Sequence, residues 1–144
     1  MPSICVQKVD LPYTEKDIIR FEEGFIGMPN IKRMVLINQD DIQPFLWLVS
    51  LDEPNIGFLV LQAQSFFPNY KPQIPADLCE QLGITEEGKS LILATVTIAA
   101  EWEQSTTNLR APIVIAPETM RGAQIILSGS PYRLDESLPI AVAA

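Results

Sequence analysis

The stretch Thr106–Leu127, TTNLRAPIVIAPETMRGAQIIL, decides the fold that we expect for the whole chain. Its two apolar runs, Ile113–Ile115 and Ile125–Leu127, predict two β-strands joined by a turn. Pro112 interrupts the first run, and proline within a sheet is confined to edges, strand starts or bulges. A polar group that ends at Asn108 precedes this run. We interpret Asn108 as a turn or bulge residue whose side chain bonds its own backbone.

Short apolar runs separated by turn residues predict further β-strands before this stretch. They lie at Ser3–Val9, Asp17–Phe21, Met34–Asn38, Phe45–Leu51, Gly57–Ala63 and Leu91–Ala100. Residues Asp10–Pro12 are expected to form a turn that ends the first run. The turn at Asp52–Asn55 joins two of the runs into a hairpin. In the second run, alternation directs Ile19 and Phe21 into the core.

A single segment, Pro75–Leu82, has the pattern of a helix. Proline suits the first helical turn, Leu78, Cys79 and Leu82 share one face, and Gly83 supplies a stop. Strands that do not alternate with helices argue against a parallel α/β sheet. We therefore expect a mainly β fold, either a compact antiparallel β-barrel-like domain or a sandwich, with one short helix near residues 75–82. A length of 144 residues suggests a single domain over residues 1–144.

Composition narrows the classes of function. The net charge of −8 opposes binding to nucleic-acid phosphates and suits either solubility or a basic protein partner. The chain contains no histidine, which removes the commonest general base and the commonest metal ligand. No motif points to a metal or cofactor, so we expect neither. Two cysteines without a CxxC, no signal peptide and no apolar run of about 18 residues favour the cytoplasm and no membrane association.

Carboxylates occur as adjacent pairs at predicted turns: Glu22 and Glu23, Asp40 and Asp41, Asp52 and Glu53, Glu86 and Glu87, and Asp135 and Glu136. One explanation is that acidic residues solubilise exposed turns. The alternative is that several turns gather at one rim and form a negative surface for a basic partner.

Two further groups of residues leave alternatives open. Glu101 and Glu103 lie near a strand end and are the best candidates for a carboxylate-based enzyme, which would need a pocket around them. The aromatic residues Phe66, Phe67 and Tyr70 lie in a proline-rich stretch outside the predicted strands. They either cover one end of a barrel or form an exposed anchor for a protein partner.

Several motifs in order resemble the FliW-type flagellar assembly factors. TTNLRAPIVI followed by GAQIIL is similar to the signature of that family. The remaining segments follow along the chain: IRFEEGFIG at Ile19–Gly27, PFLWLVSLDEPNIGFLVLQA at Pro44–Ala63, FPNY at Phe67–Tyr70, LGITEEGKSLILATVTI at Leu82–Ile98, and Tyr132 after the last hairpin. The resemblance covers nearly the whole chain without a large insertion.

The resemblance implies a non-enzymatic regulator with a compact, mainly antiparallel β-barrel-like fold. It implies that the protein binds CsrA, the RNA-binding carbon storage regulator, and relieves its repression of flagellin synthesis. It also implies binding to flagellin, so that accumulated flagellin frees the repressor. Candidate partner contacts are Asp52, Glu53, Asn69, Tyr70, Asn108 and Arg110. We expect charge reversal at Asp52 and Glu53 together to weaken repressor binding without affecting folding.

Two other functions remain as alternatives to the regulator. The carboxylate-based enzyme predicts a deep pocket beside Glu101 and Glu103. A small-ligand-binding β-barrel predicts an enclosed apolar cavity.

Overall fold

The structure is a computed structural model that describes residues 3–6, 9–53, 56–85 and 90–138. The described residues form eleven β-strands, two α-helices and three single-turn 3-10 helices. The strands are β1 (Ser3–Val6), β2 (Val9–Pro12), β3 (Ile18–Arg20), β4 (Arg33–Ile37), β5 (Leu46–Ser50), β6 (Gly57–Gln62), β7 (Leu91–Thr97), β8 (Thr106–Thr107), β9 (Ile113–Ala116), β10 (Arg121–Gln124) and β11 (Glu136–Ser137). The helices are α1 (Ala63–Phe66), α2 (Ala76–Leu82), η1 (Glu15–Asp17), η2 (Asp40–Ile42) and η3 (Trp102–Gln104).

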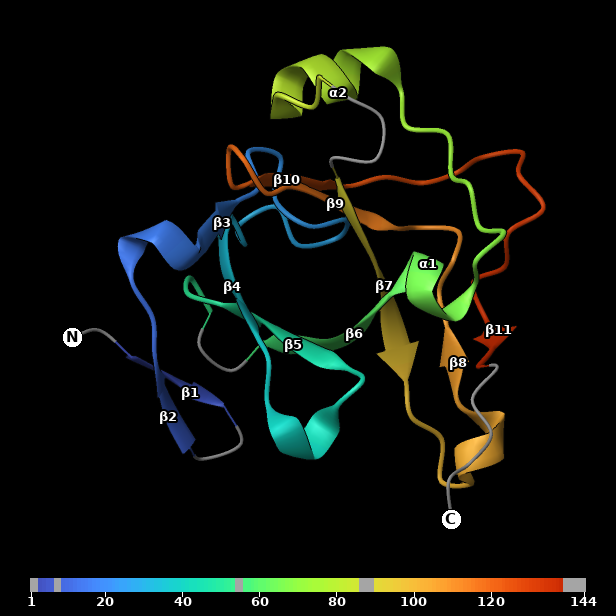
Figure 1. The fold of residues 1–144 in the computed structure, drawn as a ribbon, viewed down its shortest axis with the longest axis horizontal. Helices are drawn as coiled ribbons and strands as arrows, with labels where there is room; N and C mark the ends of the chain where they lie inside the picture. The colour runs from blue at the N-terminus through green and yellow to red at the C-terminus, as the bar shows by residue number, and fades with distance from the viewer. Residues whose placement is uncertain (1–2, 7–8, 54–55, 86–89, 139–144) are drawn as a thin grey trace.

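Seven strands close into a barrel, which confirms the predicted mainly β, barrel-like fold (Figure 1). The order is β7-β6-β5-β4-β3-β10-β9, and β9 pairs back onto β7. Every pair in this ring is antiparallel except β3 with β10, which is parallel. There Arg20 lies opposite Arg121, and its backbone N–H donates to the carbonyl of Met120 at 2.9 Å. The barrel therefore closes through residues about a hundred positions apart.

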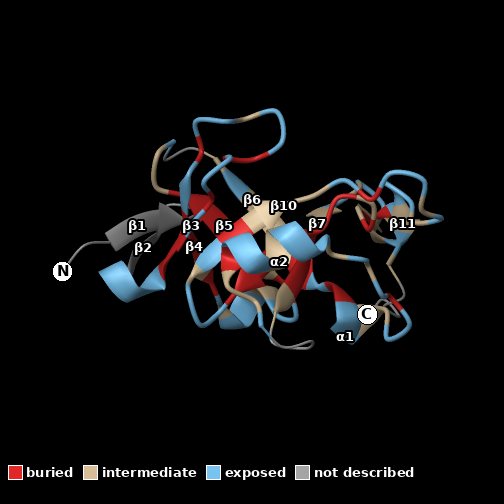
Figure 2. Ribbon diagram, turned by 90° about the horizontal axis from the view of Figure 1, so that it is seen from above, coloured by how far each residue is buried: buried red, intermediate tan, exposed pale blue. Residues whose placement is uncertain are grey.

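Side chains fill the interior of the barrel. A cluster of buried apolar residues comes from six of its seven strands and from the loop after β3: Ile19, Phe21, Phe25, Ile31, Met34, Leu48, Val60, Leu93, Ile113 and Ile115. The rings of Phe25 and Phe58 stack at 5.0 Å between centroids. Figure 2 shows buried residues concentrated along the central strands. The inward orientation predicted for Ile19 and Phe21 is confirmed, and the filled interior argues against the small-ligand-binding barrel.

The predicted helix is confirmed as α2, with Pro75 at its N-cap. Leu82 of this helix packs on Val114 and Ala116, so α2 covers the outer face of β9 and β10. Gly83 ends the helix with φ of 81°, a conformation that glycine adopts without strain. Thr119 then donates its hydroxyl to the carbonyl of Leu82 at 2.6 Å.

The proline-rich stretch after β6 covers the outer face of β6 and β7. Its aromatic residues Phe66, Phe67 and Tyr70 pack against a buried cluster that includes Leu61 and Ile92. α1, which the sequence did not predict, begins this cover and lies beside β7 (Figure 1). The aromatic residues therefore close off one side of the barrel wall, rather than a barrel end or an exposed anchor patch.

Three predicted segments differ from the structure. The second strand of the stretch Thr106–Leu127, which the sequence placed at Ile125–Leu127, is instead Arg121–Gln124. Beyond it, the backbone N–H groups of residues 125 and 127 donate to the carbonyls of residues 112 and 110 outside regular strand pairing, and Ile126 is 56% exposed. The turn expected at Asp10–Pro12 is instead part of β2, which pairs with β1 in a separate hairpin. β7 ends at Thr97, three residues before the end that the sequence predicted at Ala100.

Parts of other predictions lie outside the described residues: the turn residues Pro54 and Asn55, the acidic pair Glu86 and Glu87, and residues 7 and 8 of the first predicted strand. The predicted hairpin of β5 and β6 is nevertheless confirmed by its pairing. Pro112 lies directly before β9, as the rule for proline at strand starts predicts.

Candidate protein-binding surface

Tyr70 anchors the irregular stretch between the two α-helices. Its side chain is buried, and its hydroxyl donates a hydrogen bond of 2.6 Å to the carbonyl of Leu109. Its ring meets the Tyr132 ring edge-on at 4.6 Å, and the Tyr132 hydroxyl accepts a bond from the backbone N–H of Lys71 at 3.0 Å. Burial, with the neighbouring Tyr132 phenol, raises the pKa of Tyr70, so its hydroxyl stays a proton donor at neutral pH.

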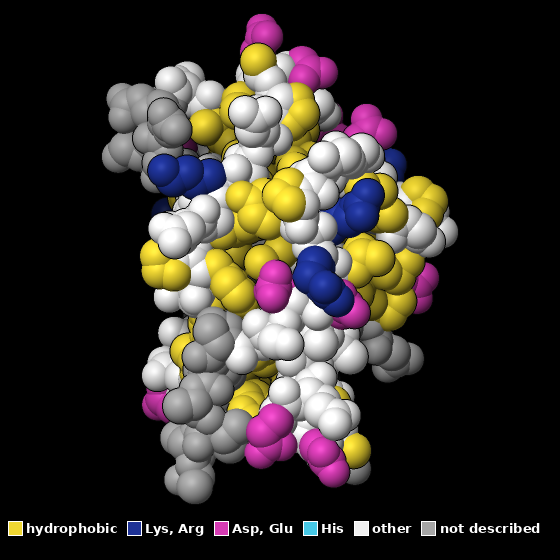
Figure 3. All heavy atoms as spheres, turned by 90° about the vertical axis from the view of Figure 1, so that its right-hand side faces the viewer, with side chains coloured by type: hydrophobic (Ala, Val, Ile, Leu, Met, Phe, Trp, Pro, Cys, Tyr) yellow, Lys and Arg dark blue, Asp and Glu magenta, His cyan; other side chains and the backbone are white. Residues whose placement is uncertain are grey.

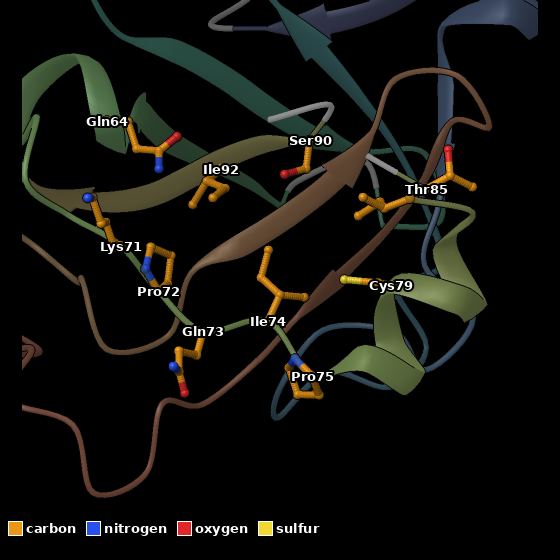
Figure 4. A pocket seen from close by; sticks show the side chains of 11 residues that line it. Gln64, Lys71, Pro72, Gln73, Ile74, Pro75, Cys79, Thr85, Ser90 and Ile92 are labelled. Carbon is orange, nitrogen blue, oxygen red and sulfur yellow. The ribbon is translucent and has the colours of Figure 1, made fainter. Parts of the chain in front are cut away.

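A groove of about 970 Å³ opens beside this anchored stretch. Residues 71–75 run extended along one side, while α2 and the start of β7 form the others (Figure 4). Figure 4 shows Cys79 of α2 pointing toward Ile74. Apolar residues lie beside amide and hydroxyl groups in its lining: Gln64, Lys71, Pro72, Gln73, Ile74, Pro75, Cys79, Ile84, Thr85, Ser90 and Ile92. Such a mixed lining suits a peptide segment that has both apolar side chains and a polar backbone.

Asn108 shapes the bend before β9. Its Oδ1 atom accepts hydrogen bonds from the backbone N–H groups of Arg110 at 3.0 Å and Ala111 at 3.1 Å. The interpretation of Asn108 as a turn residue that bonds its own backbone is confirmed. The side chain of Arg110 is half-buried and lines a second groove with Tyr132 and Arg133. The bend thus fixes the position from which the Arg110 side chain extends.

The carboxylate of Asp52 is hydrogen-bonded to the start of β4, so it is not free to bind a partner. Its Oδ2 atom accepts from the backbone N–H groups of Lys32 and Arg33, both at 2.8 Å, and its Oδ1 atom accepts from Arg33 Nε at 3.1 Å. Burial alone would raise the pKa of the Asp52 carboxyl, but these hydrogen bonds and the Arg33 charge together lower it. From these contacts we now expect charge reversal at Asp52 to destabilise the fold, in contrast to the expectation from the sequence.

The remaining candidates fall into two places. Asn69 is exposed next to buried Tyr70, and Tyr70 bonds Leu109, so Asn69 lies near the Asn108–Arg110 bend. Glu53 is exposed and follows Asp52, which is bonded to Lys32 and Arg33 at the start of β4 and not to the Asn108–Arg110 bend. The structure thus does not bring all six candidates together. Partner contact at Glu53, Asn69 and Arg110 stays a prediction, while Tyr70 is buried away from any partner.

Sequence reasoning missed the residues that line the large groove. Gln64 and Ile92 are 28 positions apart, and only the packing of the proline-rich stretch across β7 brings them to one groove. The one available signal was the run of prolines at 68, 72 and 75, which excludes a regular strand and leaves an extended, exposed edge.

Figure 3 shows the side of the molecule on which residues 67–75 and 128–135 lie in Figure 1. Lys and Arg side chains lie among hydrophobic side chains across its middle, with acidic side chains beside them and toward both ends. This side therefore presents both apolar and charged groups to solvent.

The described part of the chain contains no group of three or more potential metal ligands among His, Cys, Asp and Glu. None of its helices has the length and apolar character needed to span a bilayer. Glu101 and Glu103 are both exposed, and neither lines one of the two grooves.

Comparison with known proteins gives consistent matches. The model of the family described as FliW protein matches residues 7–138. The flagellar assembly factor FliW of Clostridium beijerinckii is 33% identical over 129 residues, which are 90% of this chain and 92% of the relative. Its counterpart from Geobacillus kaustophilus is 36% identical over 129 residues, covering 90% and 89%. A crystal structure of the flagellar assembly factor FliW superposes with a TM-score of 0.88 at 34% identity, covering 98% of this chain and all of that one.

Proposed function

Because the chain belongs to the FliW family of flagellar assembly factors, we propose that it regulates flagellin synthesis by exchanging two protein partners. In one state it binds the translational repressor CsrA and relieves repression. In the other state it binds flagellin, and the repressor is released to act on its RNA. Such exchange requires only that occupancy by one partner lowers the availability of the protein for the other.

The observation that carries this proposal, beside family membership, is the contrast between the inside and the outside of the barrel. The interior is packed with side chains such as Phe21, Leu48 and Leu93, while the large groove lies on the outer surface. A filled interior leaves no room for a small ligand inside the barrel, so we infer that the protein acts by binding other macromolecules at its surface. We infer that it has no catalytic activity and that it works in the cytoplasm, where the repressor and newly made flagellin occur.

Charge supports a basic protein as one partner. The chain carries 18 acidic and 10 basic residues, a balance that attracts a positively charged repressor and repels RNA. Exposed Glu53 is one of the acidic residues placed to contribute. The protein would therefore act on the repressor without contacting nucleic acid itself.

We assign the large groove to a peptide segment of one of the two partners. Gln73 lines this groove with an exposed side chain, so Gln73→Arg would fill its edge without disturbing the core. We expect binding of the partner that uses the groove to weaken about tenfold or more. Gln62→Arg is the matched control, because Gln62 is also exposed but does not line the groove.

Calorimetry with purified components tests the proposal. The protein is titrated with the CsrA-type repressor of its own organism and, separately, with flagellin. Saturable binding of both at micromolar concentrations is expected. Absence of binding to both partners at those concentrations would refute the proposed function for this protein.

A further inference from the structure

We propose that a second groove, centred on Arg110 and Arg133, binds an acidic peptide segment of a protein partner. This groove has a volume of about 420 Å³ and lies apart from the larger one. Its lining is Arg110, Ser130, Pro131, Tyr132, Arg133, Leu134 and Asp135. The inference goes beyond the proposed partner exchange, because it concerns the chemistry that one groove recognises and holds for whichever protein supplies the segment.

The backbone around this groove is fixed by hydrogen bonds. The N–H of Leu109 donates to the carbonyl of Arg133 at 3.0 Å, and the N–H of Leu127 donates to the carbonyl of Arg110 at 2.8 Å. The Asn108 side chain caps the N–H of Arg110, and the Tyr132 ring packs edge-on against Tyr70. Both arginines therefore extend from a backbone that is already ordered, which lowers the entropy lost when a ligand binds.

Arg110 provides the main evidence that the ligand of this groove is charged. Its side chain is half-buried, yet it forms no ion pair or hydrogen bond with the described residues. By contrast, the guanidinium groups of Arg20 and Arg33 have carboxylate partners, Glu15 and Asp52. A guanidinium group presents five donors in a fork that fits a carboxylate, so Arg110 is ready to receive one from outside the chain.

Arg133 adds a second positive charge to the same groove. Its Nε atom lies 3.2 Å from Asp135 Oδ1, but the two side chains are 65% and 66% exposed. An exposed pair of this kind contributes little, and the other donors of Arg133 remain for a ligand. The groove thus presents two guanidinium groups against one carboxylate, the reverse of the balance of the whole chain, whose net charge is −8.

Apolar surface beside the two arginines favours a peptide over a phosphate backbone. Leu134 is 62% exposed, and Pro131 is exposed next to Tyr132. A ligand that satisfies both features carries carboxylates and an apolar side chain close together. An RNA could contact the two arginines here, but the negative charge of the whole protein would repel its phosphates. We therefore expect the affinity for RNA, which depends on counterion release, to be weak.

Mapping by NMR tests the proposal. The ¹⁵N-labelled protein is titrated with a short peptide of glutamate, serine and leucine, and then with the same peptide carrying lysine in place of glutamate. We expect saturable shifts at the backbone amides of residues 109–111, 130 and 132–135 with the acidic peptide only. Equal shifts with the lysine peptide, or shifts elsewhere alone, would contradict the proposal.

Variants separate charge recognition from adventitious binding. We expect Arg110→Gln with Arg133→Gln to weaken binding of the acidic peptide about tenfold, since two charge-assisted contacts are lost. Arg20→Gln serves as the control, because Arg20 is exposed on β3 and lines neither groove. Unchanged affinity in the double variant, with an intact spectrum of the folded state, would overturn the assignment. Tighter binding of a short single-stranded RNA to these amides would also overturn it.

Discussion

The hydroxyl of Tyr70 lies 2.6 Å from the carbonyl oxygen of Leu109, and this hydrogen bond joins the irregular stretch after α1 to the bend before β9. Tyr70 belongs to the aromatic cover of β6 and β7, while Leu109 lies in the bend before β9. Both residues are buried. The bond therefore couples the wall of the large groove to the backbone that carries Arg110.

Tyr70→Phe should destabilise the protein by about 1–3 kcal/mol, because it leaves the buried carbonyl of Leu109 without this donor. The measurement is the free energy of unfolding from urea denaturation. Tyr132→Phe is the matched control, since its hydroxyl accepts a more exposed bond from Lys71, and we expect a loss below about 1 kcal/mol. Equal losses in the two variants would show that the Tyr70 bond has no special role.

Asp52→Asn should reduce stability by about 1–2 kcal/mol near neutral pH, where the carboxylate accepts bonds from Lys32 and Arg33. The pKa of Asp52 is lowered in the folded state, so its stabilisation is present above the unfolded pKa of about 3.9 and is lost as the pH falls through the folded pKa. Urea denaturation between about pH 7 and pH 3 should show the difference between wild type and variant shrinking below about pH 4. A difference that is constant across this range would exclude the linkage.

Gly122→Ala should destabilise the barrel by about 1–3 kcal/mol through overpacking. A Cβ atom at Gly122 would lie 2.8 Å from the Phe21 ring, which is buried in the barrel interior. Gly57→Ala is the control, because its nearest neighbour would be at 3.6 Å, an ordinary contact distance. Thermal unfolding should give a clearly lower Tm for Gly122→Ala than for Gly57→Ala, and similar values would disprove this packing argument.

Glu53→Lys should weaken binding of the CsrA-type repressor by a few fold while leaving stability nearly unchanged, since Glu53 is exposed and its side chain makes no hydrogen bond with the described residues. Calorimetry at low salt and at about 1 M salt should show the difference between wild type and variant disappear at high salt. If neither the substitution nor the ionic strength changes the affinity, Glu53 does not take part in the contact with the repressor. This single substitution replaces the double charge reversal, because Asp52 has a structural role.

Local features of the fold could be predicted from the sequence because they depend on neighbouring residues. The alternation of Ile19 and Phe21, the hairpin of β5 and β6, and the helix between Pro75 and Gly83 are of this kind. Closure of the barrel could not be predicted, because it joins β3 to β10 in parallel across about a hundred residues. Strand pairing at that distance leaves no signal in a turn or a local period.

The candidate surface was harder to predict for the same reason. Asn108 acts on its own backbone, so its role followed from its type and position. Tyr70 gave no local indication of burial, because its partners Leu109 and Tyr132 come from much later in the chain. The sequence indicates only that Asp52 is an acidic turn residue, because its partner Arg33 is brought to it by the pairing of β4 with β5.

A competition measurement tests the central claim most directly. A preformed complex of the protein with fluorescently labelled CsrA-type repressor is titrated with flagellin, while fluorescence anisotropy reports the repressor that is bound. Partner exchange predicts that flagellin releases the repressor in a saturable manner and that the released repressor regains binding to flagellin messenger RNA. A stable complex of all three proteins, or repressor that remains bound at saturating flagellin, would contradict it.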